Sequence, residues 1–338
     1  MPVLQIFAAL AVTLVASLLV PLVLRPILIA RGAYDVANER SSHAGAVVRG
    51  LGLGVWLALA AGWLVLLLGG PLAPEVRPLA WGLFAAFNFA ALIGAFEDLR
   101  GLSVVARSVA QLAFAGLVLW QVLSHFGAGL AVWQLALWVV FGIFFISSYV
   151  NVANFMDGLN GMSALHGIVA GLAFIAAGFL AGHVWLSLAG ALLALAFFGF
   201  LPWNLAGRGF LGDVGSYLLG GAVVSLSFAA LLAGVLPLAA IGPTVVYFGD
   251  VGWTLLKRRR QGKKWSQPHK EHVYQRLQQS GFSHFAVSLI MAGFTLFASL
   301  LGLASYLWPS LLGQAVLLVA GFAVVVLYVN LPRLLHKN

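Results

Sequence analysis

Long runs of apolar residues alternate with short polar stretches along the whole chain. A helix of about twenty apolar residues is long enough to cross a bilayer, so each run predicts a membrane-spanning helix. We therefore expect an all-α, polytopic membrane protein with about eleven spans, built as a single domain over residues 1–338. The expected spans are residues 3–24, 51–70, 78–96, 105–123, 132–150, 162–182, 184–202, 214–234, 236–256, 284–306 and 311–331. The first run lacks a basic segment before it and a small-residue cleavage site after it, which favours a retained helix over a signal peptide.

The composition agrees with this pattern and removes several kinds of chemistry. The chain is 62% hydrophobic and only 8% charged, which is far from the composition of a soluble domain. It contains no cysteine, so disulfides and thiolate metal sites are excluded. The sequence has no long polar block that could fold as a separate soluble domain, and we expect no nucleic-acid partner.

The basic residues predict how the helices cross the membrane. Every Lys and Arg except Arg77 falls in the C-terminal tail or in loops on the same side of the predicted helices as that tail. Basic residues are retained on the cytoplasmic side, so these loops and the C-terminus are expected in the cytoplasm and the N-terminus outside. The acidic residues other than Glu75 gather on or near the same face.

Polar chemistry on one membrane face indicates an enzyme that takes one substrate from the cytoplasm and a second from the lipid. A transporter or lipid-binding membrane protein is the alternative of a different class. It is expected to carry charged residues deep in several spans and often an internal repeat. Among the charged residues, only Asp250 lies beyond the first or last turn of a predicted span, and no clear repeat is visible in the sequence.

The polar loop at residues 151–161 reads N-V-A-N-F-M-D-G-L-N-G. It offers amide and carboxylate oxygens beside glycines that let the backbone turn tightly, and hard cations such as Mg²⁺ bind such oxygens. The alternative is a short Asn/Gly turn that only joins two membrane helices. The segment by itself leaves both interpretations open.

Two further loops place carboxylates at the ends of predicted spans. Glu97 and Asp98 are adjacent at a membrane boundary, where two carboxylates are costly unless a cation or a base uses them. A solvated helix end paired with Arg100 is the alternative. Asp213 lies between two glycines just before a span, where free backbone N–H groups favour a phosphate and its metal. Plain N-capping explains Asp213 equally well.

The basic loops offer candidate anion-binding side chains. Arg40 and His43 suit an anionic headgroup or phosphate, although anchoring on the membrane surface explains them equally well. His272 and Arg276 are four residues apart and share a face if the segment is helical, so they are candidates for holding a pyrophosphate. The basic run at residues 257–260 is better explained as an orientation anchor.

These segments together resemble the motifs of the polyprenyl-phosphate N-acetylhexosamine-1-phosphate transferases, a bacterial type of glycosyltransferase family 4. Residues 151–161 are similar to that family's N-x-x-N-x-x-D-G-x-[DN]-G loop, and residues 210–216, F-L-G-D-V-G-S, to its F-x-G-D-x-G-S loop. Glu97-Asp98 stands where the family has Asp-Asp. Residues 35–52 resemble its D-x-P-N-x-R-x-x-H…R-G-G segment, with Ala37 for Pro and Leu51 for Gly. The four motifs occur in the family's order, and the resemblance covers nearly the whole chain. Each motif alone is weak evidence, but the four together are specific to the family.

The resemblance implies a reaction at the membrane surface. The phosphate of undecaprenyl phosphate attacks the β-phosphorus of a UDP-N-acetyl sugar, UMP leaves, and undecaprenyl-diphospho-sugar stays in the membrane. A phosphate monoester has a second pKa of ~6 and is already anionic near neutral pH. The protein then has mainly to position the substrates and neutralise charge. The implied cofactor is Mg²⁺ or Mn²⁺.

The family's site residues carry over only onto matching positions. Asn154 and Asp213 would hold the Mg²⁺ that bridges the diphosphate. Asp98 with Glu97 would orient or deprotonate the lipid phosphate, and Asp157 would organise the loop. The implied substrate contacts are Asn160 at the uracil, Arg107, His272 and Arg276 at phosphates, and the candidates Arg40 and His43 in the first loop.

Two departures from the family pattern bear on the mechanism and on which branch of the family this chain resembles. Glu97 is one methylene longer than the usual Asp, so a strict two-Asp mechanism does not carry over unchanged. Residues 272–275 read H-V-Y-Q, whereas many relatives have His-x-His-His. This favours the branch that initiates O-antigen, lipopolysaccharide or other surface glycans. The donor would then be UDP-N-acetylfucosamine, UDP-N-acetylquinovosamine or UDP-GlcNAc. The phospho-MurNAc-pentapeptide transferase of peptidoglycan synthesis, a cell-wall enzyme, stays the alternative.

The resemblance also implies a location and partners. The protein is expected in the bacterial inner membrane, as a multi-pass protein with its N-terminus in the periplasm and its active site and C-terminus in the cytoplasm. Its partners would be undecaprenyl phosphate, a UDP-N-acetyl sugar and membrane lipid. A homodimer follows from family analogy only.

Overall fold

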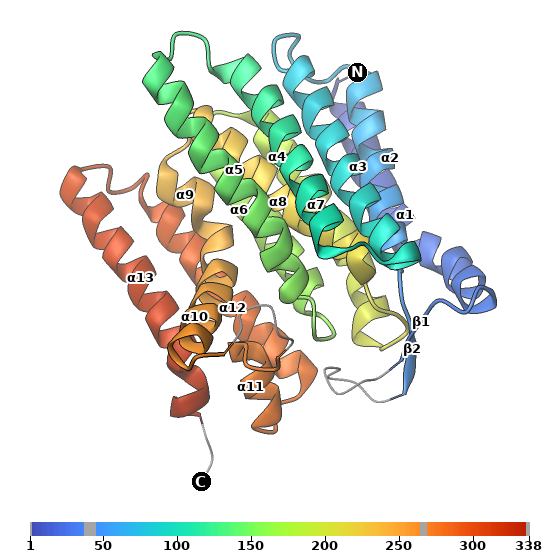
Figure 1. The fold of residues 1–338 in the computed structure, drawn as a ribbon. Helices are drawn as coiled ribbons and strands as arrows, with labels where there is room; N and C mark the ends of the chain where they lie inside the picture. The colour runs from blue at the N-terminus through green and yellow to red at the C-terminus, as the bar shows by residue number, and fades with distance from the viewer. Residues whose placement is uncertain (1, 37–44, 264–268, 336–338) are drawn as a thin grey trace.

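A computed structural model describes residues 2–36, 45–263 and 269–335 and confirms the all-α membrane architecture (Figure 1). Within these residues, ten helices are long and apolar enough to cross a membrane. They are α1 (Pro2–Ala30), α2 (Gly52–Gly69), α3 (Arg77–Arg100), α4 (Val104–Phe126), α5 (Val132–Phe155), α6 (Met162–Ala181), α7 (Val184–Leu205), α8 (Gly212–Leu232), α12 (His284–Ala304) and α13 (Leu311–Leu334).

The ninth predicted span, residues 236–256, is not one continuous helix. It is divided into α9 (Pro237–Ile241), a 3₁₀ turn η1 (Gly242–Thr244) and α10 (Val245–Arg260). Pro243 has no backbone N–H and its ring clashes with the carbonyl one turn earlier, which explains the break. α1 begins and α13 ends at opposite ends of the bundle (Figure 1), so the chain crosses it an odd number of times. The broken segment therefore accounts for the eleventh crossing.

Several helix ends follow from the local sequence. The hydroxyl groups of Ser103, Ser283 and Ser310 accept hydrogen bonds from backbone N–H groups three residues later, and so cap α4, α12 and α13. α1 contains Pro21 and Pro26 and still continues to Ala30, beyond its predicted end at residue 24. Membrane helices tolerate such prolines because neighbouring groups satisfy the freed backbone atoms.

α8 lies at the centre of the bundle and positions the candidate site. It contacts α2, α3, α4, α5, α6, α7 and α9, and every residue from Val214 to Ala230 is buried. Gly94 lets α3 approach the start of α8, because a Cβ there would lie 2.1 Å from the carbonyl oxygen of Asp213. Small residues permit such close backbone contact between membrane helices. The end of α3 is therefore held against the start of α8.

Three short elements complete the fold at the end of the bundle where α13 finishes (Figure 1). The strands β1 (Tyr34–Val36) and β2 (Ala46–Val48) pair antiparallel, with Tyr34 opposite Val48. The helix α11 (Val273–Gln279) follows α10. The sequence did not predict the strands, because three residues are too few to establish a period-two pattern.

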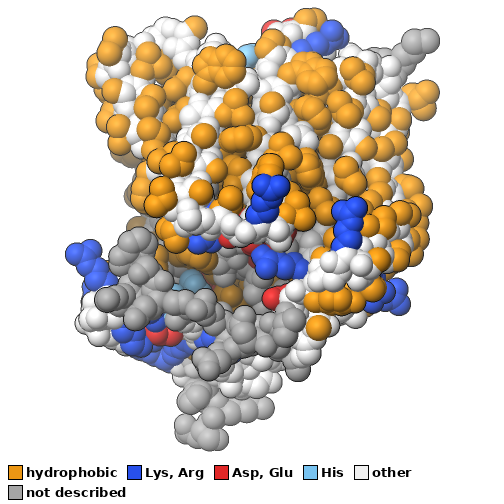
Figure 2. Space-filling view, turned by 45° about the vertical axis from the view of Figure 1, so that its right-hand side comes forward, with side chains coloured by type: hydrophobic (Ala, Val, Ile, Leu, Met, Phe, Trp, Pro, Cys, Tyr) orange, Lys and Arg blue, Asp and Glu red, His pale blue; other side chains and the backbone are white. Residues whose placement is uncertain are grey.

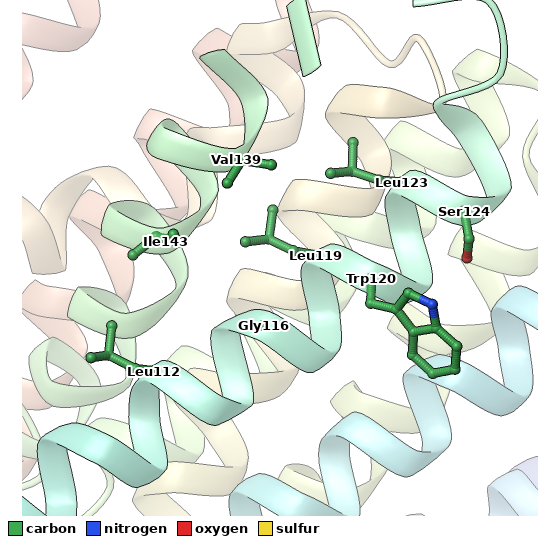
Figure 3. A pocket seen from close by; sticks show the side chains of 8 residues that line it. All are labelled: Leu112, Gly116, Leu119, Trp120, Leu123, Ser124, Val139 and Ile143. Atoms are coloured by element: carbon green, nitrogen blue, oxygen red, sulfur yellow. The ribbon is translucent and has the colours of Figure 1, made fainter. Parts of the chain in front are cut away.

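An outward-facing pocket of about 600 Å³ lies between α4 and α5 (Figure 3). It is lined by Leu112, Gly116, Leu119, Trp120, Leu123, Ser124, Val139 and Ile143. None of these side chains is charged, and Ser124 is the only polar one among them. This pocket therefore has the chemistry of a lipid-facing surface and does not suit a charged substrate.

Candidate functional site

A cluster of oppositely charged side chains lies beside the start of α2, the end of α3 and the start of α8. Nε of Arg49 lies 2.7 Å from Oδ1 of Asp98, and Nη2 lies 2.6 Å from Oδ2 of Asp213. Figure 2 shows basic and acidic side chains around a hollow at the border between the apolar body and the polar end. Burial lowers the pKa of Arg49, but the carboxylates of Asp213 and Asp98 outweigh burial and raise it above its ordinary value. Arg49 therefore stays charged.

Pairing between two loops positions Arg49. The N–H of Phe210 donates to the carbonyl of Val48 at 2.7 Å, which joins the end of β2 to the loop before α8. Gly50 and Gly212 have φ angles of +94° and +75°, in the region that favours glycine. These two glycines let the loops turn so that Arg49 reaches the start of α8.

Asp98 holds the first turn of α8. Its Oδ1 accepts a hydrogen bond from the N–H of Asp213 at 3.0 Å, and its Oδ2 accepts one from the N–H of Val214 at 2.9 Å. The first N–H groups of a helix have no partner within the helix, and their partial positive charge favours a carboxylate. The capping group is therefore Asp98, and the side chain of Asp213 is left to face Arg49.

Asn154 joins the cluster from the end of α5. Its Nδ2 donates to Oδ1 of Asp213 at 2.7 Å and to Oγ of Ser216 at 2.9 Å. Asn151, one turn earlier, exchanges two hydrogen bonds with Gln111 of α4. Of these two asparagines, Asn154 reaches the charged cluster and Asn151 ties α5 to α4.

Asp157 lies in the turn between α5 and α6. Its Oδ1 accepts a hydrogen bond from Oγ of Ser163 at 2.6 Å. Burial raises the pKa of Asp157 to about 8, and the charges of Asp213 and Asp98 contribute to this rise, while the Ser163 hydrogen bond opposes it. The Asp157 carboxyl group is therefore mostly protonated at pH 7 in this arrangement.

Asn160 presents an unusual acceptor in the same turn. Its Oδ1 is buried and has no hydrogen-bond partner among the residues that the structure describes. The backbone around it is fixed, since the carbonyl of Asn160 accepts from Oγ of Ser288 at 2.9 Å and the N–H of Gly161 donates to Asn204. A buried oxygen without a partner is costly, which makes it a candidate acceptor for an N–H group of a ligand.

Glu97 and Asp98 point into different surroundings. Oε2 of Glu97 accepts from the N–H of Leu102 at 2.9 Å, and Oε1 lies 3.5 Å from Nη1 of Arg107. Successive residues of a helix do not face each other, so adjacency in the sequence does not make these two acids a dyad. Glu97 and Arg107 form a neighbouring pair at the ends of α3 and α4.

A buried carboxylate fixes the segment after α10. Asp250 is fully buried, and its Oδ1 lies 2.8 Å from Nδ1 of His272 and accepts the N–H of Val273 at 3.2 Å. Its Oδ2 accepts the hydroxyl of Tyr328 at 2.6 Å. These contacts join α10, the start of α11 and α13. Because Nδ1 of His272 is taken, the other ring nitrogen is the one left for a ligand.

The structure separates Arg276 from His272. His272 precedes α11, whereas Arg276 lies one turn into it, beside a pocket also lined by Arg333. Tyr274 faces the site loop instead, and its hydroxyl donates to the carbonyl of Phe155 at 3.0 Å. α11 thus packs against residues 151–161 through Tyr274, while Arg276 is directed toward the end of α13.

The hard oxygen ligands of the charged cluster come from three side chains. These are the carboxylates of Asp98 and Asp213 and the amide of Asn154. Within the described ranges, no group of three or more acidic or histidine side chains is placed to hold a metal ion. A magnesium site with few protein ligands is usual where substrate phosphates and water supply the others, so these residues fit such a cation.

Sequence reasoning did not select Arg49 or Asp250 as site residues. The available signal for Arg49 was its position in the R-G segment at the end of the first polar loop. The signal for Asp250 was an acid inside an apolar run, which is costly unless it is paired. Two residues that the sequence did select, Arg40 and His43, lie outside the described residues.

Replacing Asp250 by Ala is expected to destabilise the protein strongly. The change leaves the donors of His272, Val273 and Tyr328 buried without their shared acceptor, which costs about 3–5 kcal/mol. The measurement is thermal unfolding of the purified protein in detergent. Tyr328→Phe removes one of these hydrogen bonds and should cost about 1 kcal/mol. An Asp250→Ala protein as stable as Tyr328→Phe would contradict this assignment.

The comparison with known families confirms part of the picture built from the motifs. Residues 80–231 match the model of glycosyl transferase family 4. The resemblance to this family is thereby confirmed. The region that matches glycosyl transferase family 4 contains Asp98, Asn154 and Asp213, but Arg49 and His272 lie outside it.

Individual relatives match over more of the chain. It is 28% identical over 327 residues to the "probable undecaprenyl-phosphate N-acetylglucosaminyl 1-phosphate transferase" of Bacillus subtilis, covering 91% of this chain and 87% of the relative. It is 28% identical over 302 residues to the decaprenyl-phosphate N-acetylglucosaminephosphotransferase of Mycobacterium tuberculosis, covering 77% and 72%. It is 33% identical over 230 residues to the phospho-N-acetylmuramoyl-pentapeptide-transferase of a Synechococcus species, covering 62% and 64%.

Proposed function

We propose that this protein transfers an N-acetylhexosamine 1-phosphate from a UDP-sugar to undecaprenyl phosphate and releases UMP. The observation that carries the proposal is the cluster of Arg49, Asp98, Asp213 and Asn154 at one end of an apolar helix bundle. This cluster combines a cation for phosphate, carboxylates for a metal ion and a polar amide, and the pocket that holds Arg49 and Asp98 is also lined by the apolar side chains of Leu28, Leu53 and Leu99. The family match and the names of the relatives support the same reaction.

The proposed orientation has the site and the C-terminus in the cytoplasm and the N-terminus in the periplasm. The distribution of Lys and Arg in the sequence supports it. A bacterial inner membrane then supplies the lipid acceptor from within the bilayer, and the nucleotide sugar arrives from the cytoplasm. The two substrates meet at the border where the charged cluster lies.

The proposed chemistry is an in-line displacement at phosphorus. A phosphate oxygen of undecaprenyl phosphate bonds to the β-phosphorus of the donor, and the bond to the bridging oxygen breaks, so that its electron pair leaves with UMP. Mg²⁺, when bound, would neutralise charge on the diphosphate. Asp213 and the amide oxygen of Asn154 would hold it. Arg49 would orient the phosphate groups, while Asp98 holds Arg49 and keeps the start of α8 in place.

The remaining site residues receive supporting roles. The unpartnered Oδ1 of Asn160 would accept the imide N–H of the uracil, and Asp157 would keep the turn around it in shape through Ser163. Arg107, held by Glu97, would contact a phosphate group. His272 would donate from its second ring nitrogen to the donor diphosphate when both of its ring nitrogens carry a proton.

We propose UDP-GlcNAc as the donor, because the relatives that match most of the chain are named for this sugar. The product would start a surface or cell-wall glycan, with O-antigen and lipopolysaccharide as members of that class. A second candidate donor is UDP-MurNAc-pentapeptide, because the relative from Synechococcus is named a phospho-N-acetylmuramoyl-pentapeptide-transferase. The single His in residues 272–275 argues against this donor.

The test is UMP release by the purified protein in detergent, with undecaprenyl phosphate, Mg²⁺ and a panel of UDP-sugars. The panel contains UDP-GlcNAc, UDP-N-acetylfucosamine, UDP-N-acetylquinovosamine and UDP-MurNAc-pentapeptide. Release is expected only when the lipid is present, and EDTA should stop it until excess Mg²⁺ is added. Release that persists after EDTA treatment would overturn the metal proposal. A folded protein that neither releases UMP with any donor nor binds UMP in the presence of Mg²⁺ would overturn the reaction.

A further inference from the structure

A second cationic site lies apart from the charged cluster, between the late part of α1 and the end of α7. It is a pocket of about 250 Å³ lined by Pro21, Leu22, Arg25, Pro26, Trp203 and Arg208. Its two basic side chains come from segments that are far apart in the sequence. The proposed function assigns no role to either of them.

Specific contacts hold the pocket in shape. Nε of Arg25 donates to the backbone carbonyl of Arg208 at 2.9 Å, and the guanidinium carbon of Arg208 lies 5.6 Å from the centre of the Trp203 ring. Nε1 of Trp203 donates to the carbonyl of Leu18 at 3.0 Å, which fixes the ring against α1. The contact between Arg208 and Trp203 is a cation–π interaction and leaves the edge of the guanidinium group for another partner.

The two guanidinium groups have no acidic partner in the described part of the chain. The ion pairs among residues 2–36, 45–263 and 269–335 involve Arg49, Arg107, Arg258, Lys263 and His272 as the cations. Two like charges brought to one pocket repel each other, so an anion placed between them is stabilised. Phosphate suits arginine because its oxygens accept two parallel hydrogen bonds from the planar guanidinium group.

The surroundings of the pocket are those of a lipid headgroup. Leu22 is 56% exposed, and α1 continues this apolar surface with Leu19, Val23 and Ile27, which are also exposed. Tryptophan and arginine are typical of the membrane interface, where an apolar body meets a polar end. A soluble anion would satisfy the two charges but would leave the apolar strip beside them without a partner.

We propose that this pocket binds the phosphate of an anionic phospholipid, with an acyl chain lying along the exposed face of α1. Arg25 and Arg208 contact the phosphate from two sides, and Trp203 holds Arg208 in position. The bound lipid ties the late part of α1 to the end of α7. This inference does not depend on the proposed transferase reaction.

The test measures lipid binding to the full-length protein in detergent, by native mass spectrometry and by thermal unfolding. The probes are phosphatidylglycerol, phosphatidylcholine with the same acyl chains, undecaprenyl phosphate and inorganic phosphate. We expect phosphatidylglycerol to raise the melting temperature of the wild type more than the other three. In the double variant Arg25→Gln/Arg208→Gln, binding of the first phosphatidylglycerol should be about tenfold weaker. Retention of wild-type phosphatidylglycerol affinity would overturn the proposal.

A matched control removes the same charge elsewhere. Arg259→Gln/Arg260→Gln also loses two positive charges from exposed positions and should keep the phosphatidylglycerol affinity of the wild type. An equal loss of phosphatidylglycerol affinity in both double variants would show that positive charge attracts the lipid nonspecifically. That result would overturn the proposal that this pocket binds it. If the Gln variant fails to fold, Arg25→Lys/Arg208→Lys keeps the charge but loses the paired hydrogen bonds, and a smaller but measurable weakening of phosphatidylglycerol binding is expected.

The other probes separate the sources of phosphate. Equal stabilisation by inorganic phosphate, lost in the double variant, would identify a free-anion site and overturn the lipid assignment. Preference for undecaprenyl phosphate over phosphatidylglycerol at this pocket would assign it to the reaction's lipid acceptor instead. Stronger effects of phosphatidylglycerol than of phosphatidylcholine, lost only in the Arg25/Arg208 variants, support the proposal.

Discussion

Replacing Asp213 by Asn is expected to lower the rate of UMP release by about 10³-fold, because one preorganised charged group at such a centre contributes that much. Asn keeps the size of the side chain but removes the negative charge that faces Arg49 and Asn154. It also removes a carboxylate ligand proposed for Mg²⁺. The measurement is the turnover of the purified variant with saturating donor and lipid.

The Asp213→Asn variant should remain folded, which makes the loss of turnover interpretable. The ion pair between Arg49 and Asp213 is partly exposed, with 38% of the Arg49 side chain accessible, and partly exposed pairs contribute only about 0–1 kcal/mol to stability. The control is Glu75→Gln, which removes an exposed carboxylate from the connection between α2 and α3 and should leave turnover unchanged. Turnover within tenfold of the wild type in Asp213→Asn would remove Asp213 from the proposed metal site.

Replacing Gly94 by Ala is expected to damage the site through the backbone. The added Cβ would lie 2.1 Å from the carbonyl oxygen of Asp213 and 2.7 Å from Cα of Val214, and backbone atoms cannot yield as a flexible side chain does. α3 and α8 must move apart, at a cost of about 1–3 kcal/mol. The shift separates Asp98 from the first turn of α8, and displacements of this kind lower turnover by about 10²-fold.

A second glycine in a neighbouring helix supplies the matched control. Gly116 of α4 has no atom within 4 Å of its added Cβ. Gly116→Ala should therefore leave turnover unchanged and raise the free energy of unfolding by about 0.5–1 kcal/mol, because alanine favours the helix. Thermal unfolding and UMP release are measured on both variants. Equal behaviour of Gly94→Ala and Gly116→Ala would show that the contact between α3 and α8 does not govern the site.

The spans were predictable from the sequence because hydropathy alone determines which segments prefer lipid. The run at residues 284–306, for example, corresponds to α12, His284–Ala304. The break at Pro243 was not predictable in this way, since Pro21, Pro26 and Pro202 remain inside continuous helices. Whether a proline interrupts a membrane helix depends on the partners that neighbouring helices offer its backbone.

The sequence predicted the acidic and amide residues of the candidate site, but it did not predict which side chains pair with one another. The motifs placed Asp98, Asn154 and Asp213 at helix ends, and the structure brings them together. Arg49 was not selected, because its position depends on the contact between β2 and the loop before α8, which no local pattern reveals. Glu97 was grouped with Asp98 because they are adjacent, yet the helix directs them to different partners. The catalytic and binding roles of all these residues stay predictions.

The burial of α8 has a consequence for how the protein is made. A helix covered on every side has no surface left for lipid once the bundle is complete, and its glycines and serines suit close contact with other helices. Six of the helices that α8 contacts, α2 to α7, precede it in the chain, while α9 and η1 follow it. During synthesis α8 therefore leaves the ribosome after most of the helices that surround it are already in the membrane. Because of this order, the segment that carries Asp213 has partner helices to pack against as soon as it enters the membrane.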